Sequence, residues 1–489
     1  MTQPADTAGV VAPPETSSPS GTAPTRARTP RRGPADLPFR FADRALAQAL
    51  AAERDEPAWL RAERIAAWQA FEPLAVETNQ LYTPYVDLRG ADLFDVRPYV
   101  RTDAASTKDA DRGPSPVAED LDGIIELAED RVVSLGLSPA ATKAGVRLET
   151  LGAALARDPQ GLRRELEGGQ TLPTDDKLAL LARGFWSQGV RLEVPDGVLL
   201  ERPILVRWRS SVPQRALLTR TLVHLGAGAA ATLVEEQLPS GPQIGCAAGE
   251  TVPQGLFTGT TEVTLGRDAS LAVASIQDLC DEQVTFQHRS ATIGEGASLH
   301  WALAQLGAKL VRSRVDNRLV GDHSAVEQVE IVFGGSDQLF DLTSYTRHLG
   351  RDTTGNLLSK GVLLDRARSY LKGLITIEKT AVGTDSFLGE FGMNLSKAAR
   401  AVAIPSLEID QPDCRRAAHS SAVGPIDPSQ LFYLESRGIP PDEARKFVVL
   451  GFLEPVVARV PLEAARDQLR ELLEAKWATG MASIEGAAA

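Results

Sequence analysis

Glycine-centred turns recur along the second half of the chain at nearly equal intervals. They lie at Gly226, Gly266, Gly294 and Gly321, each followed by a small residue three positions later and then by an apolar run. The interval from Gly266 to Gly294 is 28 residues, and the next one is 27. Short strands that repeat at this distance, with no helix between them, predict a β-solenoid, in which each coil buries its inward side chains by stacking on the next.

The first interval, from Gly226 to Gly266, is 40 residues long. It fits the same period if the loop-like segment 238–250 is an insertion of about a dozen residues into one coil. We expect the turn glycines to occupy corners with positive φ, which glycine adopts at little cost. A β-sandwich is the alternative, although its strand spacing is usually shorter and less regular.

The expected fold class is mainly β, with a right-handed parallel β-helix core over residues 190–427, flanked by N-terminal and C-terminal α-helical regions. We expect residues 37–189 to form a mainly helical N-terminal domain with a linker near 103–119, and the stretch 121–189 to be mostly helical. The segment from residue 40 to about 72 is also expected to be helical. Its residues Ala62, Ile65, Trp68 and Phe71 form an apolar stripe that should pack against another element. Residues 428–489 are expected to form a C-terminal helical domain.

The N-terminal segment 1–36 has a composition that disfavours folding. It contains seven prolines, many Ser and Thr residues, and a basic cluster at Arg26, Arg28, Arg31 and Arg32. Such a segment cannot bury enough apolar area to offset its ordering entropy, so we expect a disordered tail. A plastid transit peptide is the alternative, because Arg with Ser and Thr and few acids is its signature.

Charge and motifs exclude several classes of function. A net charge of −12 argues against nucleic acid as a partner. We found no apolar run long enough to cross a membrane and no secretory signal, so a cytoplasmic location is expected. No P-loop and no HExxH motif occur, which speaks against ATP hydrolysis and zinc-enzyme chemistry by this chain.

Two blocks of the second half resemble a known family. The first runs from His348 to Phe387 and contains the turn and strand DTTGNLLSKGVLL. The second comprises IPSLEI at 404–409, AHSSAVGPID at 418–427 and LFYLESRGIPPDEAR at 431–445, with a weaker match, VPDGVLLERPI, at 194–204. These blocks are similar to the core shared by SufB and SufD, the scaffold proteins of iron–sulfur cluster assembly. The long N-terminal region and the histidine before the SSAVG turn resemble SufD.

The resemblance implies a non-catalytic scaffold subunit. It would pair with a SufB-like subunit through their β-helices and recruit a SufC-like ABC-type ATPase through C-terminal helices, with the ATPase activity in SufC. A homodimer without SufB is a further possibility. The residues expected to contact SufC lie in the C-terminal helical region: Phe432, Arg437, Phe447, Val448, Phe452 and Leu453.

The resemblance also implies a shared assembly site. His419 matches the family histidine thought to lie at the SufB–SufD interface, where it would be an iron ligand or an interface hydrogen bonder. Cys414 and His348 are weaker candidates. Many SufD sequences carry a cysteine two residues before this histidine, but that position is Ala417 here, and His348 is better interpreted as a coil-stacking or turn-capping residue.

Cysteine usage limits what the chain can hold by itself. Only Cys246, Cys280 and Cys414 occur, they are dispersed, and they form no CxxC pair. Iron–sulfur clusters usually need about four thiolates, so we expect no cluster held alone and a transient cluster or iron shared with SufB. The alternative function is a carbohydrate-active β-helix enzyme, a lyase or hydrolase, which would use clustered carboxylates or calcium in a groove.

Overall fold

The computed structural model describes residues 32–100, 115–168, 172–240, 253–460 and 462–488. The expected tail up to residue 31, the expected linker up to residue 114 and Cys246 lie outside the described residues. All elements below belong to the unit Pro34–Ala489.

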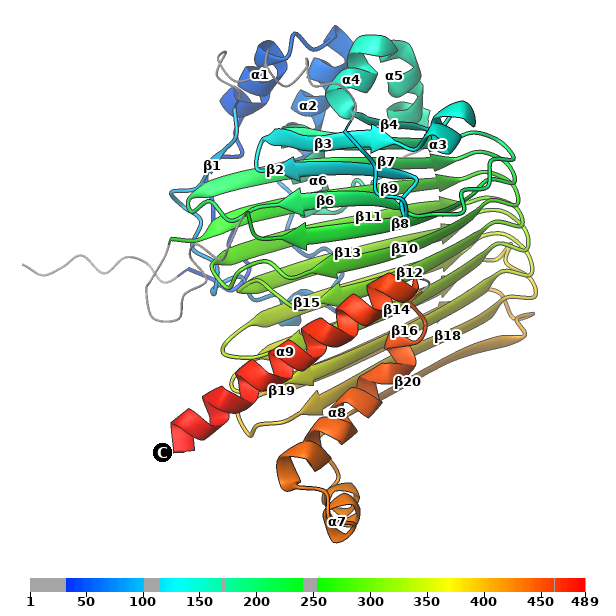
Figure 1. The fold of residues 1–489 in the computed structure, drawn as a ribbon. Coiled ribbons are helices and arrows are strands. Elements are labelled where there is room, and N and C mark those ends of the chain that lie inside the picture. Colours follow the sequence, from blue (N-terminus) through cyan, green and yellow to red (C-terminus); the bar gives the residue numbers. More distant parts are fainter. Residues whose placement is uncertain (1–31, 101–114, 169–171, 241–252, 461, 489) are drawn as a thin grey trace, which may run out of the picture. The chain divides into compact units, whose positions relative to one another are not determined.

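Two parallel sheets run along the solenoid, and successive strands from β5 to β20 alternate between them (Figure 1). Each coil therefore contributes one strand to each sheet, and the described residues make about eight turns. Sheet A contains β5 (Gln188–Val194), β7 (Arg215–Leu225), β9 (Gly255–Leu265), β11 (Gln283–Ile293), β13 (Leu310–Leu319), β15 (Leu339–His348), β17 (Arg368–Ile377) and β19 (Arg400–Ile409). Sheet B contains β6 (Ile204–Arg209), β8 (Ala230–Leu238), β10 (Ser270–Gln277), β12 (Ser298–Gln305), β14 (Ala325–Gly334), β16 (Thr354–Leu363), β18 (Asp385–Asn394) and β20 (Arg416–Gly424). The expected parallel β-solenoid is confirmed.

The register of the strands confirms the repeat. Ser270 pairs with Ser298, and Ser298 pairs with Ala325, which reproduces the intervals of 28 and 27 residues. Ala230 pairs with Ser270, so the 40-residue interval is also one coil. Its extra residues lie between β8 and β9, and residues 241–250 of the expected insertion are outside the described part of the chain.

The turn glycines are needed for a different reason from the one we expected. Positive φ occurs two residues later, at Gly228 (65°), Asp268 (54°), Gly296 (64°) and His323 (60°), and not at the glycines of the repeat. A Cβ atom on Gly321 would lie 2.0 Å from the backbone nitrogen of the preceding coil. These glycines are therefore required because the coils approach each other closely at this corner.

Strands between residues 123 and 150 extend both sheets at the N-terminal end of the solenoid. They are β2 (Gly123–Ala128) and β3 (Arg131–Leu137) in sheet B, and β4 (Arg147–Thr150) in sheet A; the short β1 (Arg97–Pro98) pairs with β7. The stretch 121–189 was expected to be mostly helical, and its first part is not. Alternate residues of β2 are buried, which is the pattern of a strand and not of a helix.

Six described helices precede β5, and all but one pack on the outer face of sheet A. They are α1 (Arg44–Glu53), α2 (Ala58–Phe71), α3 (Pro139–Lys143), α4 (Leu151–Arg157), α5 (Pro159–Gly168) and α6 (Lys177–Phe185), with a 3₁₀ turn η1 (Thr83–Tyr85). The exception is α3, whose Ala141 joins the interior core. Residues of α1, α2 and α6 share one hydrophobic cluster with Phe286 of β11 and Leu310 of β13. This cluster fixes the N-terminal region on the solenoid.

The C-terminal region contains three described helices, α7 (Pro428–Ser436), α8 (Pro441–Val457) and α9 (Glu463–Ala488). Figure 1 shows α8 and α9 lying across the outer face of sheet B, where Val449, Leu453 and Leu469 pack on residues of β12, β14 and β16. The helix α7 buries no residue. Among the described helices, none is both long and apolar enough to cross a membrane.

Candidate functional site

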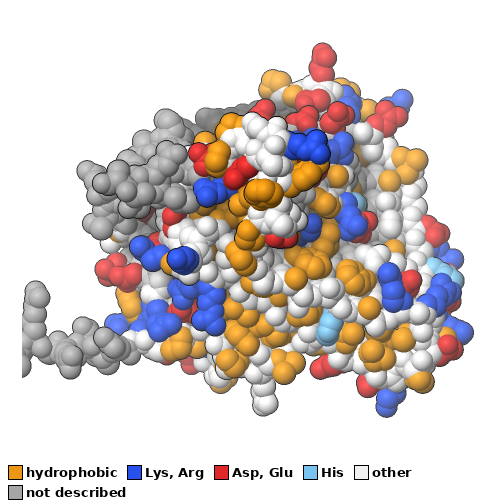
Figure 2. All heavy atoms as spheres, turned by 90° about the horizontal axis from the view of Figure 1, so that it is seen from below, with side chains coloured by type: hydrophobic (Ala, Val, Ile, Leu, Met, Phe, Trp, Pro, Cys, Tyr) orange, Lys and Arg blue, Asp and Glu red, His pale blue; other side chains and the backbone are white. Residues whose placement is uncertain are grey.

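The C-terminal end of the solenoid is uncovered. Within the described part of the chain, β19 and β20 are the last strands of their sheets, and each has a hydrogen-bonded neighbour on one side only. No residue of β20 is buried, and Ile409 and Val423 are 46% and 41% exposed. Figure 2, which looks from below, shows hydrophobic side chains forming a patch across the middle of this view. Such edges are open to pairing with another chain.

His419 lies on the uncovered strand β20. It pairs in register with Leu388 of β18, whose side chain is buried in the solenoid interior. Neighbouring residues of in-register parallel strands point to the same face, so the imidazole faces the interior side at its open end. His419 is exposed, because no further coil lies beyond it in the described chain.

A column of polar side chains runs through the interior toward the same end. In sheet B, Glu330 pairs with Ser359, Ser359 with Glu390, and Glu390 with Ser421, two residues after His419. The carboxylate of Glu390 accepts a hydrogen bond from the backbone N–H of Ile404 at 2.9 Å. Our sequence reasoning missed these acids, because they align only once the coil register is known.

Burial controls the charge of these two acids. It raises the pKa of Glu390 to about 8, and the nearby Glu330 acts in the same direction. Burial likewise raises the pKa of Glu330 to about 7. Glu390 therefore carries a proton at neutral pH, just inside the coil that bears His419.

His348 lies inside the solenoid and away from solvent. Its Nδ1 is 2.8 Å from Thr353 Oγ1, and its Nε2 is 3.1 Å from Ser386 Oγ. Burial lowers the pKa of His348 to about 4, so the ring is neutral at pH 7. Both ring nitrogens are engaged within the protein, which leaves none for a metal and favours the coil-stacking interpretation.

Cys414 lies just before β20 as a free, half-buried thiol that packs partly against the last interior hydrophobic cluster. It precedes His419 by five residues. Within the described ranges, no group of three or more His, Cys, Asp and Glu side chains could hold a metal ion.

The expected SufC-contacting residues separate into two groups. Phe432 of α7 and Phe447 of α8 are 73% and 57% exposed, and Arg437 is exposed beside the ring of Tyr433. Val448 and Phe452 are half-buried. Leu453 is fully buried against sheet B, where it docks the helix on its own solenoid, and its expected contact with SufC stays a prediction.

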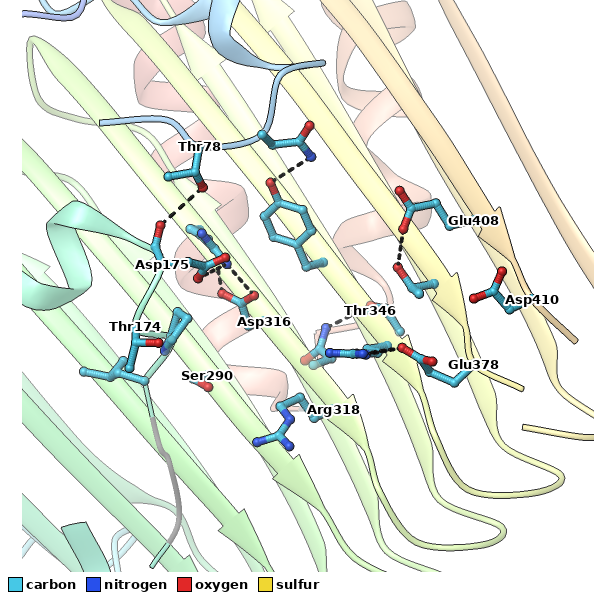
Figure 3. Close-up of a pocket in the computed structure, with 18 residues that line it drawn as sticks. Thr78, Thr174, Asp175, Ser290, Asp316, Arg318, Thr346, Glu378, Glu408 and Asp410 are labelled. Atoms are coloured by element: carbon cyan, nitrogen blue, oxygen red, sulfur yellow. Dashed lines mark hydrogen bonds and ion pairs between the residues drawn. The ribbon is translucent and has the colours of Figure 1, made fainter. Parts of the chain in front are cut away.

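A second concave region lies on the outer face of sheet A. This groove has a volume of about 700 Å³ and crosses β13, β15, β17 and β19, with residues 78–79 and 172–175 along its wall (Figure 3). Our sequence reasoning did not find it, because its charged residues come from strands that are separated by entire coils.

Comparisons with known proteins agree with the fold. Residues 208–452 match the family model described as SUF system FeS cluster assembly, SufBD core domain. The solenoid is thus the core of a protein class that works in iron–sulfur cluster assembly. The chain belongs to the SufBD family, which confirms the expected SufB/SufD-type resemblance.

Two relatives illustrate the extent of the match. The chain is 30% identical over 303 residues to the iron–sulfur cluster assembly protein SufD of Bacillus subtilis. The aligned region covers 62% of this chain and 67% of that protein. It is 24% identical over 430 residues to a SufBD family protein of Staphylococcus epidermidis, with 85% and 89% of the two chains covered. The family assignment favours an assembly role over the carbohydrate-active alternative.

Proposed function

We propose that this chain is a SufD-like scaffold subunit, which pairs with a SufB-like subunit and recruits a SufC-like ATPase. The observation that carries the proposal is the uncovered last coil, where both sheets end in strands with one free edge. The similarity to a protein named SufD supports the choice of subunit.

The strand β20 is the better pairing edge of the two. Pro405 lies in the middle of β19 and has no backbone N–H to donate, whereas the residues of β20 include no proline. A SufB-like solenoid that adds its own edge strand to β20 would continue sheet B and cover the exposed Val423.

His419 would then lie at the junction of the two subunits. An accessible imidazole is a suitable ligand for iron, and a thiolate or carboxylate of the partner would complete the coordination. The cluster, or the iron alone, is cargo that both subunits hold transiently, since this chain has too few thiolates for a complete set.

The exposed face of α7 and the start of α8 is the proposed SufC surface. Phe432, Tyr433 and Phe447 are large exposed apolar side chains, and Arg437 adds a charge beside them. Aromatic and arginine side chains are enriched where protein interfaces carry most of their binding energy.

Co-expression with SufB-like and SufC-like partners tests the proposal. We expect one stable complex by size-exclusion chromatography with light scattering. A chain that binds neither partner, or that forms only a homodimer in their presence, would contradict the proposed function.

The role of His419 needs a separate variant. We expect His419→Ala to keep the complex intact while the reconstituted complex loses most of its iron and acid-labile sulfide. The matched control is His323→Asn, because His323 is an exposed turn residue at positive φ, which asparagine tolerates. Equal iron and sulfide contents in the two variants would remove the ligand role.

A further inference from the structure

Hydrogen bonds connect the wall segments of the groove on sheet A to each other and to its floor. Thr78 Oγ1 donates a hydrogen bond to the carbonyl of Asp175 at 3.2 Å, which ties the two wall segments together. Asn79 Nδ2 donates to Tyr345 Oη on the floor at 3.3 Å. Its volume of about 700 Å³ lies within the range of sites that bind small ligands or short peptide segments.

One guanidinium in the groove has no partner. Arg314 is satisfied by Asp316 at 2.8 Å and by Asp176 at 3.2 Å, and Arg347 pairs with Glu378. Among the residues that the structure describes, the Arg318 guanidinium makes neither a hydrogen bond nor an ion pair, although the residue is half-buried.

Register makes this unpaired charge more costly. Arg318 lies directly opposite Arg347 on the neighbouring strand, so two guanidiniums share one face at one strand spacing. Like charges in this position destabilise a sheet. A carboxylate over Arg318 would offset the repulsion and could form two parallel hydrogen bonds with the guanidinium.

The other end of the groove has the opposite charge. Glu408 accepts a hydrogen bond from Thr376 at 3.3 Å, and neither it nor Asp410 contacts a cation within the described residues. Figure 3 shows both carboxylates on one side of Glu378 and Arg318 on the other. The free charges of the groove are thus separated into a basic end and an acidic end.

The distance between these ends follows from the register. Arg318 pairs with Arg347, Arg347 with Thr376, and Thr376 with Glu408, so the two ends are three strand spacings apart. Three spacings are about 14 Å, the length of about four extended residues. A free amino acid or an inorganic anion is too short to contact both ends.

We propose that the groove binds an extended peptide segment of a partner protein, which crosses the strands with an acidic side chain over Arg318 and a basic side chain over Glu408 and Asp410. This proposal does not depend on cluster assembly, although the acidic end of the groove lies at β19, the last described strand of sheet A. It requires only the charge separation and the length of the groove.

Fluorescence anisotropy with the full chain tests the proposal. The probes are labelled peptides in a Ser/Thr host with Asp and Lys about four residues apart, with Lys at both positions, and with neither charge. We expect the wild-type protein to prefer the Asp/Lys probe and Arg318→Glu to prefer the Lys/Lys probe, each by about tenfold in Kd. Arg318→Gln should bind both charged probes weakly.

The matched control is Arg366→Glu, an exposed arginine in the turn between β16 and β17, outside the groove. It should leave the wild-type preference unchanged. Equal binding of the uncharged probe, an unaltered preference in Arg318→Glu, or displacement of the Asp/Lys probe by equimolar inorganic phosphate would overturn the proposal. Circular dichroism of each variant verifies that it is folded.

Discussion

The fold tolerates the charged side chain of Arg289 inside the solenoid because this side chain has specific hydrogen-bond partners. Arg289 lies in the interior, where its Nη2 donates to Glu235 Oε2 at 2.8 Å and to Ser275 Oγ at 2.8 Å. Its Nη1 donates to Gln287 at 2.7 Å. Burying such a pair costs desolvation free energy, but breaking it costs more, because one charge is then left without compensation.

Arg289→Met should therefore lower the free energy of unfolding by about 3 kcal/mol, because it leaves the buried Glu235 carboxylate unpaired. The double variant Arg289→Met with Glu235→Leu should regain most of that loss. Urea unfolding of the wild-type protein and both variants measures the difference. Additive losses in the double variant would show that the ion pair is not the source.

The buried acids predict a dependence of stability on pH. The pKa of Glu390 is about 8 in the folded chain and near 4.5 ordinarily, so the folded state binds more protons between these values. The free energy of unfolding should fall as pH rises through this window and change no further from this residue above it.

Glu390→Gln should reduce that slope, because glutamine keeps an acceptor for the Ile404 N–H but has no proton to lose. Urea midpoints at pH 6 and pH 8.5 provide the measurement. If the difference between the two urea midpoints is the same in the wild-type protein and in Glu390→Gln, the raised pKa of Glu390 is contradicted.

At the scale of elements, helix α2 shows how an ion pair overrides an apolar pattern. The expected stripe included Ile65 and Trp68, yet the buried face contains Arg64, whose guanidinium donates to both Glu56 carboxylate oxygens at 2.7 Å. Ile65 and Trp68 are only partly buried. Spacing alone could not reveal this, because the partner that makes Arg64 tolerable in the interior lies outside the helix.

The coil corners allow a paired test at the same scale. Gly321→Ala should cost about 2–4 kcal/mol, because its Cβ would lie 2.0 Å from the backbone nitrogen of Glu295. Gly228→Asn should cost less than about 1 kcal/mol, because that residue has positive φ and a Cβ there would meet no atom within 4 Å. Thermal unfolding of both variants compares them. Equal losses would contradict the close-approach explanation.

At the scale of the whole molecule, the two ends of sheet B differ. Among the described residues, sheet B ends in the antiparallel hairpin β2–β3 on one side and in the parallel strand β20 on the other. Natural proteins usually protect such edges with charge, proline or covering elements. The uncovered edge beside His419 is the feature that the proposed partner would cover.

Val423→Lys should weaken binding of a SufB-like partner by at least about tenfold, because a lysine on β20 opposes strand pairing and desolvation. The melting temperature of the isolated chain should stay unchanged, since Val423 is exposed. Val133→Lys on β3, where Val133 is 46% exposed at the opposite end of the same sheet, is the matched control. Equal affinities of the two variants would exclude β20 as the edge.

The amino-acid sequence by itself determined the solenoid, its coil length and its family. Gly266, Gly294 and Gly321 recur at the coil length because each contacts the preceding coil closely. The coil length is therefore visible in the sequence as the spacing of these glycines. A local motif likewise predicted the role of His419, which stays a prediction. Features of this kind repeat or match over short distances, and a pattern can therefore detect them.

Only the tertiary structure decided which side chains meet across coils. Glu330 and Glu390 are 60 residues apart in the sequence but belong to one interior column, and Arg318 and Glu408 form opposite ends of one groove. The hairpin near residue 130 belongs to the solenoid for the same reason, since β2 pairs with β6, which lies about 80 residues later in the chain. Stacking brings residues that are one coil apart in the sequence to within a few ångströms of each other in space. A local sequence pattern does not contain this spatial distance.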